Sequence, residues 1–153
     1  MDDLPATDDL ARVDALLAFW LDEVGPQGWF RRDAAIDAAC RRHFGALVEA
    51  APTGAFAPWS AWPEGALARL ILLDQLPRNI HRGDPRAHAG DALALATAKA
   101  AIARGHDLAI APRWRPLFYL PLMHSERLAD QERCVRLVLM RLPRGDGEGD
   151  GEG

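Results

Sequence analysis

Apolar side chains recur every three or four positions along most of this chain, which is the spacing of one face of an α-helix. The pattern predicts six helices, over residues 7–24, 34–51, 63–76, 85–105, 112–123 and 126–142. Thr7, Asp33 and Ser125 are expected to cap the first, second and last helices, and Pro77 to end the third at Leu76. No segment combines period-two alternation with β-branched residues, so no sheet is expected.

The sequence therefore predicts an all-α fold of antiparallel helix pairs. One domain over residues 1–144 suits a chain of 153 residues. Residues 145–153 contain only Gly, Asp and Glu and have nothing to bury, so we expect a disordered tail.

The charge distribution argues against nucleic-acid binding. The formal net charge is -4, and the tail alone carries four acidic residues, so the rest of the chain is formally neutral. Affinity for nucleic acid rests largely on clustered Lys and Arg that neutralise phosphates. No nucleic-acid partner is expected.

The N-terminus lacks the basic and apolar regions of a signal peptide, and no apolar stretch is long enough to span a bilayer. We therefore expect a cytoplasmic protein without a membrane partner. Cys40 and Cys134 fall on apolar helical stripes without metal-ligand spacing and are interpreted as reduced core residues. Glycine-rich nucleotide loops are absent, and no cofactor is predicted.

Two segments place polar residues where the helical pattern calls for apolar ones. Asp74 follows Leu70 and Ile71 by four and three residues, so it shares their core-facing stripe. Because an unpaired buried carboxylate is unfavourable, Asp74 is expected to lie out of solvent beside Arg78, Arg82 or His124. Gln131 is likewise predicted on the buried stripe of the last helix.

The same segments carry a family resemblance. Leu73-Asp74-Gln75-Leu76-Pro77-Arg78-Asn79, Ala89-Gly90-Asp91 and Tyr119-Leu120-Pro121-Leu122-Met123-His124-Ser125-Glu126 with Asp130-Gln131 resemble the bacterial family called domain of unknown function 924. Trp29-Phe30, Asp37 and Phe44 are similar to its N-terminal pattern, so the matches span most of residues 13–142. The resemblance implies a tetratricopeptide-like helical domain around a cleft, and no 34-residue repeat is visible in the chain itself.

The chain departs from this family at its C-terminus. Members of the family usually continue with further helices that carry another His and a second string like Leu76 to Asn79, whereas this chain runs into the Gly-acid tail. The resemblance therefore implies that only part of the family's site is present.

Three interpretations of the polar segments remain open. The first is a binding cleft for a small anionic molecule or a peptide, held by Arg78 and Arg82. The second is a metal-dependent or hydrolytic enzyme site using Asp74, Asp91, His124 and Glu126. The third is a purely structural polar network. The candidate ligand-binding residues are Asp74, Gln75, Arg78, Asn79, Arg82, Asp91, His124, Glu126 and Gln131.

The last helix predicts a protein partner. Its apolar positions, which include Leu128, Val135, Val138, Leu139 and Leu142, form a stripe wider than one neighbouring helix can cover. A large uncovered apolar strip is unusual on a soluble monomer. We therefore expect self-association, as in a homodimer through this helix, unless the earlier helices close over the strip.

Overall fold

The computed structural model describes residues 7–143, and this part of the chain is helical with no strand. The α-helices are α1 (Thr7–Leu17), α2 (Gly25–Trp29), α3 (Ala34–Ala50), α4 (Pro63–Leu70), α5 (Leu76–Ile80), α6 (Asp91–Ala103), α7 (Leu120–His124) and α8 (Leu128–Arg141). The predicted all-α fold is confirmed. The predicted tail, residues 145–153, lies outside the described residues.

Two π-helical segments lengthen these helices into the long rods that the pattern predicted. Ala18–Val24 extends α1, and Ile71–Gln75 joins α4 to α5. Short 3-10 helices at Ala51–Thr53, Ala57–Ala61, Pro85–His88, His106–Ala109 and Arg115–Phe118 make the connections.

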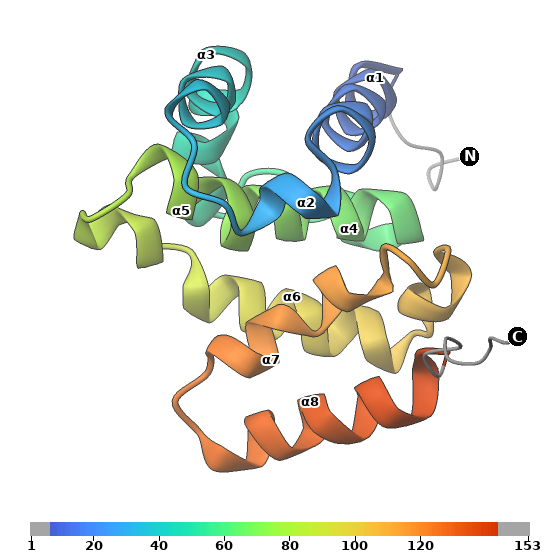
Figure 1. Ribbon diagram of the computed structural model, residues 1–153. Coiled ribbons are helices and arrows are strands. Elements are labelled where there is room, and N and C mark those ends of the chain that lie inside the picture. Colours follow the sequence, from blue (N-terminus) through green and yellow to red (C-terminus); the bar gives the residue numbers. More distant parts are fainter. Residues whose placement is uncertain (1–6, 144–153) are drawn as a thin grey trace, which may run out of the picture.

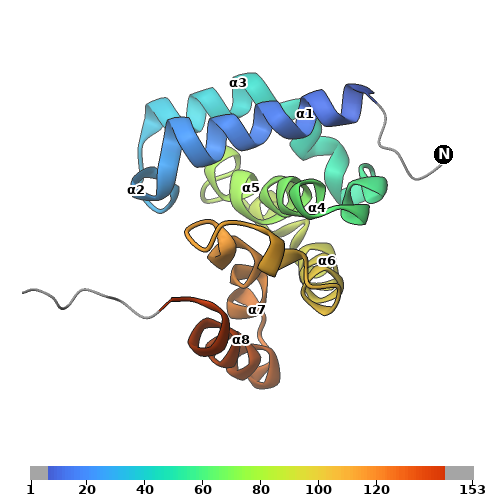
Figure 2. The same ribbon diagram turned by 90° about the vertical axis from the view of Figure 1, so that its right-hand side faces the viewer.

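The helices are stacked in layers (Figures 1 and 2). Helices α1 and α3 form the outer layer, and the α4–α5 rod lies beneath them, with α1 on α4 and α3 on α5. Helices α6 and α7 follow, and α8 packs on α7 at the opposite edge of the stack.

The α4–α5 rod is the centre of the core. Every residue from 65 to 77 is buried, because helices cover the rod on both sides. Trp20, Trp59, Phe118 and Tyr119 are among the largest fully buried side chains around it. A polar residue on this rod must find its partners inside the protein, and Asp74 is such a residue.

The predicted end of the third helix at Leu76 is wrong, because the rod continues through Pro77 to Ile80. Proline lacks a backbone N–H, and its ring crowds the carbonyl group four residues earlier, here that of Leu73. A π turn precedes the proline, and in it the Leu76 N–H bonds to the Ile71 carbonyl. Gly90 packs against the Leu73 carbonyl, where an added Cβ would lie 2.9 Å from the oxygen.

The fourth helix begins later than predicted. Asp84 and Pro85 start a 3-10 turn, in which the Asp84 carboxylate accepts from the Arg86 N–H at 2.8 Å. The 3-10 turn ends at His88, and helix α6 begins only at Asp91, with Gly90 as its N-cap. The predicted end at Gly105 is confirmed, since this glycine has a left-handed conformation with φ 76°.

The predicted caps have different outcomes. Asp33 caps α3 by accepting from the N–H groups of Ala35 and Ile36 at 2.9 and 3.2 Å. Thr7 is the first residue of α1 rather than its cap. Ser125 does not cap α8, because the helix starts at Leu128 with Arg127 in the cap position.

Helix α8 presents a different face to the core from the one we predicted. Its buried residues are Asp130, Cys134 and Leu137, whereas Gln131 is exposed. Ion pairs fix this rotation at both ends: Lys99 Nζ lies 2.8 Å from Asp130, and Arg141 Nη1 lies 2.9 Å from the buried Asp107. Polar contacts therefore decide which side of α8 turns inward.

Cys40 and Cys134 are both free and buried, as predicted. Burial is the largest cause that raises the pKa of the Cys40 thiol, to about 12. Within residues 7–143, no helix has the length and apolar character that crossing a membrane would take.

Candidate functional site

The candidate site is centred on the buried carboxylate of Asp74, which pairs with the partly exposed imidazole of His124. Asp74 belongs to the π turn of the central rod and is 1% exposed, so its predicted burial is confirmed. His124 Nδ1, at the end of α7, lies 2.8 Å from Asp74 Oδ1. The His124 side chain is 27% exposed, and no residue of the described chain bonds to its Nε2.

Asp74 has two further side-chain partners. Gln75 Nε2 donates to Asp74 Oδ2 at 2.9 Å, and Arg78 Nη1 lies 3.2 Å from Oδ1. Both Asp74 oxygens are therefore satisfied, and the carboxylate holds the imidazole in one orientation.

Arg78 connects the central rod to α6. Its Nη1 and Nη2 each donate to Asp91, both at 3.1 Å, in the two-pronged geometry that suits a guanidinium and a carboxylate. His88 Nδ1 lies 3.2 Å from the same carboxylate. Arg78 is thus occupied by two acidic residues of the protein itself.

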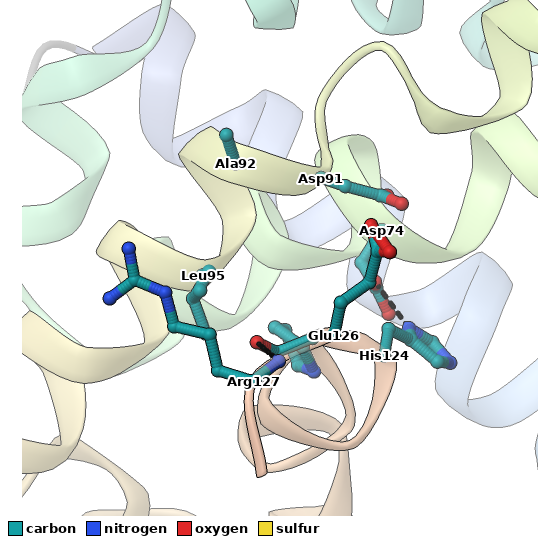
Figure 3. A pocket seen from close by; sticks show the side chains of 9 residues that line it. Asp74, Asp91, Ala92, Leu95, His124, Glu126 and Arg127 are labelled. Atoms are coloured by element: carbon teal, nitrogen blue, oxygen red, sulfur yellow. Dashed lines mark hydrogen bonds and ion pairs between the residues drawn. The ribbon is translucent and has the colours of Figure 1, made fainter. Parts of the chain in front are cut away.

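A cavity of about 250 Å³ adjoins these groups. Asp74, Asp91, His124, Ser125, Glu126 and Arg127 give it polar walls, and Ala92, Leu95 and Pro121 give it an apolar one. In the view of Figure 3, Asp74, Asp91 and His124 lie on one side of the cavity and Arg127 on the other. The cavity is therefore lined by α6 and by the turn between α7 and α8.

Asn79 and Arg82 face a different part of the molecule. Asn79 Nδ2 donates to Asp37 Oδ1 at 2.9 Å, and Arg82 donates to both Asp37 oxygens at 2.9 and 3.0 Å. The Arg82 hydrogen bond is the largest cause that holds the pKa of Asp37 below its usual range. This network joins α3 to the end of α5 and does not line the cavity.

Gln131 is also away from the cavity wall. Its side-chain nitrogen donates to the Ser125 backbone oxygen at 2.8 Å. Ser125 Oγ in turn donates to Asp130 at 2.6 Å and accepts from the Arg127 N–H at 3.1 Å. These bonds shape the turn that carries Glu126 and Arg127.

The comparisons with known proteins identify the family. The model of a bacterial protein family of unknown function, DUF924, matches residues 16–148, a range that includes all the groups described above. This chain belongs to the DUF924 family. The predicted family resemblance is confirmed.

A solved structure is similar to this DUF924 chain over most of its length. It is a protein of unknown function from Agrobacterium tumefaciens, with 39% sequence identity and a TM-score of 0.83. The match covers 86% of this chain and 74% of that one. None of the curated proteins matches this DUF924 chain. The family thus comes without an activity, and the chemistry must be argued from the site.

Four of the nine predicted site residues line the cavity of this DUF924 member, namely Asp74, Asp91, His124 and Glu126. Within residues 7–143, no group of three or more His, Cys, Asp or Glu side chains has the arrangement that would hold a metal ion. Arg127, which follows Glu126 directly, also lines the cavity and was not among the predicted site residues. Its position in a turn between two segments of candidate residues could have marked it as a site residue.

Proposed function

We propose that this protein binds a small polar molecule in the cavity between α6 and the α7–α8 turn. The observation that carries the proposal is the His124 imidazole, which buried Asp74 orients and whose Nε2 has no partner in the described chain. A pre-oriented polar group beside a cavity is a common feature of ligand sites. We also propose that the helices form a tetratricopeptide-like arrangement and that the protein is located in the cytoplasm.

The charges of the cavity favour a ligand with both an amino and an acidic group. Asp74 and Asp91 share Arg78, whereas Glu126 and Arg127 form no ion pair within residues 7–143. Arg127 therefore takes the anion-binding role that we had expected of Arg78 and Arg82, both of which already bind carboxylates. A free amino acid or a short peptide presents the complementary pair of charges.

The cavity volume agrees with a ligand of this size. At about 250 Å³, it holds a molecule of roughly eight waters' volume, taking about 30 Å³ per water. Leu95, Ala92 and Pro121 provide apolar contact for a side chain.

Titration of isotope-labelled protein with free L-amino acids and dipeptides, followed by NMR, tests the proposal. We expect saturable shifts of the His124 ring and of the Arg127 amide. Arg127→Gln removes a charge-assisted hydrogen bond worth about 1.5–3 kcal/mol, so affinity should fall at least tenfold. The matched control is Arg136→Gln, which changes an exposed arginine of α8 outside the cavity and should bind normally.

Two results would reject this function. Either no probe shifts these resonances at millimolar concentration, or Arg127→Gln and His124→Gln bind as the parent protein does. The structural-network interpretation predicts the first result, together with a loss of stability in His124→Gln.

General-base catalysis at the same cavity is the second candidate function. A histidine whose Nδ1–H donates to a carboxylate can accept a proton at Nε2, and that proton can come from a water that attacks a bound ester or amide. Ser125 is not placed as a nucleophile for the His124 base, because its hydroxyl donates to Asp130 and no hydrogen bond joins it to His124 within residues 7–143. Hydrolysis by water is therefore the reaction that this geometry favours.

The second candidate is tested on whichever dipeptide or amino-acid ester binds. Asp74→Asn would favour the wrong imidazole tautomer, so kcat should fall strongly while KM stays close to that of the parent. Binding without any product, detected by mass spectrometry over hours, would leave binding alone as the function.

A further inference from the structure

The outward face of α8 carries most of the large exposed apolar side chains of the described residues. Large apolar side chains more than one third exposed include Leu128 at 67%, Val135 at 58%, Leu139 at 73% and Met140 at 77%. Val138 of the same helix and Met123 of α7 extend this group, which we call the α8 face. Only Leu10, Phe30 and Leu108 are comparably exposed elsewhere in residues 7–143.

The α8 face is a helical stripe in its own right. Leu128, Val135 and Leu139 are seven and four residues apart, so they lie on one side of the helix. The buried residues Asp130, Cys134 and Leu137 lie on the other side. Helix α8 thus has two apolar sides, and the protein covers only one of them (Figure 1).

Charged residues on the border of the α8 face are arranged for self-recognition. Glu132 and Arg136 are both exposed, lie four residues apart, and form no ion pair within residues 7–143. A second α8 could approach in parallel or antiparallel orientation. In a parallel two-fold pair, the borders that carry Glu132 and Arg136 would lie on opposite edges of the interface, so these residues would not meet. In an antiparallel pair both borders lie on the same edge, and Glu132 of one copy can face Arg136 of the other.

We propose that a second copy of this chain docks on the α8 face as an antiparallel, two-fold symmetric pair. The axis crosses α8 midway between positions 132 and 136, so Glu132 of each copy faces Arg136 of the other. The same axis brings Leu128 of one copy level with Met140 of the other. Val135 lies close to the axis, and Leu139 lies toward the end of the interface, level with Ala129 of the other copy.

The size of the face sets the expected affinity. A helix of 14 residues is about 21 Å long, so its side buries on the order of a few hundred Å² per copy. Standard stable interfaces bury about 800 Å² per partner. The pair should therefore be a reversible dimer with a dissociation constant in the micromolar range or above.

Sedimentation equilibrium of the full chain, from about 5 to 500 μM, tests the proposal. The parent protein should pass from monomer to dimer over this range. Leu139→Asp should remain monomeric throughout. Phe30→Asp is the matched control, since Phe30 is 72% exposed and lies in the loop after α2. This variant should dimerise as the parent does.

A charge exchange tests the orientation. Glu132→Arg and Arg136→Glu should each weaken the dimer at least tenfold, and the double variant should restore it. Circular dichroism of each variant checks that α8 still forms. A folded parent protein that stays monomeric at 500 μM overturns the proposal. So does a dimer that Leu139→Asp leaves intact, or a double variant that remains as weak as the single ones.

Discussion

Arg78 Nη1 and Nη2 each donate a hydrogen bond to the Asp91 carboxylate, both at 3.1 Å. Because Arg78 also contacts Asp74, the guanidinium keeps a carboxylate partner when either acidic residue is removed. The two acidic residues differ in burial, since the Asp74 side chain is 2% exposed and that of Asp91 is 32% exposed.

Removing Asp74 should destabilise the protein without leaving Arg78 unpaired. Asp74→Ala deletes the partner of His124 Nδ1 and of the Gln75 amide, and we expect the free energy of unfolding to fall by about 2–3 kcal/mol. Urea denaturation at pH 7 measures this. Asp91→Ala should cost less, because Asp91 is partly solvated. Equal effects of the two variants would show that burial does not set their contribution.

Lys99 should hold the N-terminal end of α8 against α6. Its ion pair with Asp130 is the largest cause that lowers the pKa of that carboxyl group. In Lys99→Met we expect severalfold faster amide hydrogen exchange in α8, with exchange in α3 unchanged. Exchange that accelerates equally in both helices would contradict a local anchoring role.

Arg69 should contribute little or nothing to stability. It is 6% exposed, its Nε has no hydrogen-bond partner, and within residues 7–143 only the hydroxyls of Ser60 and Thr97 bind it. Burial lowers the pKa of this guanidinium, which means that its charge is poorly solvated. Replacing a buried charge that lacks a carboxylate by an apolar side chain is often neutral or stabilising, so Arg69→Met should leave the melting temperature unchanged or raise it.

Arg115 serves as the control for the melting temperature of Arg69→Met. It donates to the backbone oxygens of Asp107, Ile110 and Arg141 at 2.6–3.0 Å. Arg115→Met should lower the melting temperature by several degrees, because three partly buried carbonyl groups lose their donor. A similar fall in Arg69→Met would reject the prediction for Arg69.

His106 should make stability depend on pH below neutrality. Burial is the largest cause that lowers its pKa in the folded protein, and its Nδ1 is buried without a hydrogen-bond partner in the described chain. The unfolded state then binds the proton more readily than the folded state. The contribution of neutral His106 to the free energy of unfolding is fully present above about pH 6.5, the pKa of this residue in the unfolded state. It is lost as the pH falls through the lower pKa of His106 in the folded state.

The urea midpoint at several pH values between 7.5 and 5 tests His106. The parent protein should lose more stability over this range than His106→Gln does. Identical slopes for the parent and His106→Gln would contradict the prediction.

The fold was largely predictable from the sequence, because the helical periodicity of apolar residues is strong and several helix ends carry typical capping or terminating residues. Asp33 caps α3 as predicted from its side chain alone. The prediction at Pro77 was wrong, since a π turn precedes this proline and Gly90, at the N-cap of α6, packs against the Leu73 carbonyl beside it. Such a contact between distant segments leaves no local signal.

The candidate site was predictable only in part. A carboxylate on a core-facing stripe must find a partner, so the burial of Asp74 followed from the pattern. Of its three expected partners, Arg78 and His124 contact it, whereas Arg82 binds Asp37. Which face of α8 turns inward did not follow from the pattern, because ion pairs of Asp130 and Arg141 outweigh the apolar stripe. Gln131 was therefore placed on the wrong side, and Arg127 was passed over.

The close approach of Gly90 to the Leu73 carbonyl limits how this site can be transplanted. A single methyl group at position 90 would meet that oxygen at 2.9 Å, so α6 would have to move, and Asp91 with it. An engineer who grafted only the charged residues onto another helical scaffold would therefore lose their spacing. Two residues without any ionisable group, Pro77 and Gly90, belong to the minimal set that such a graft must carry.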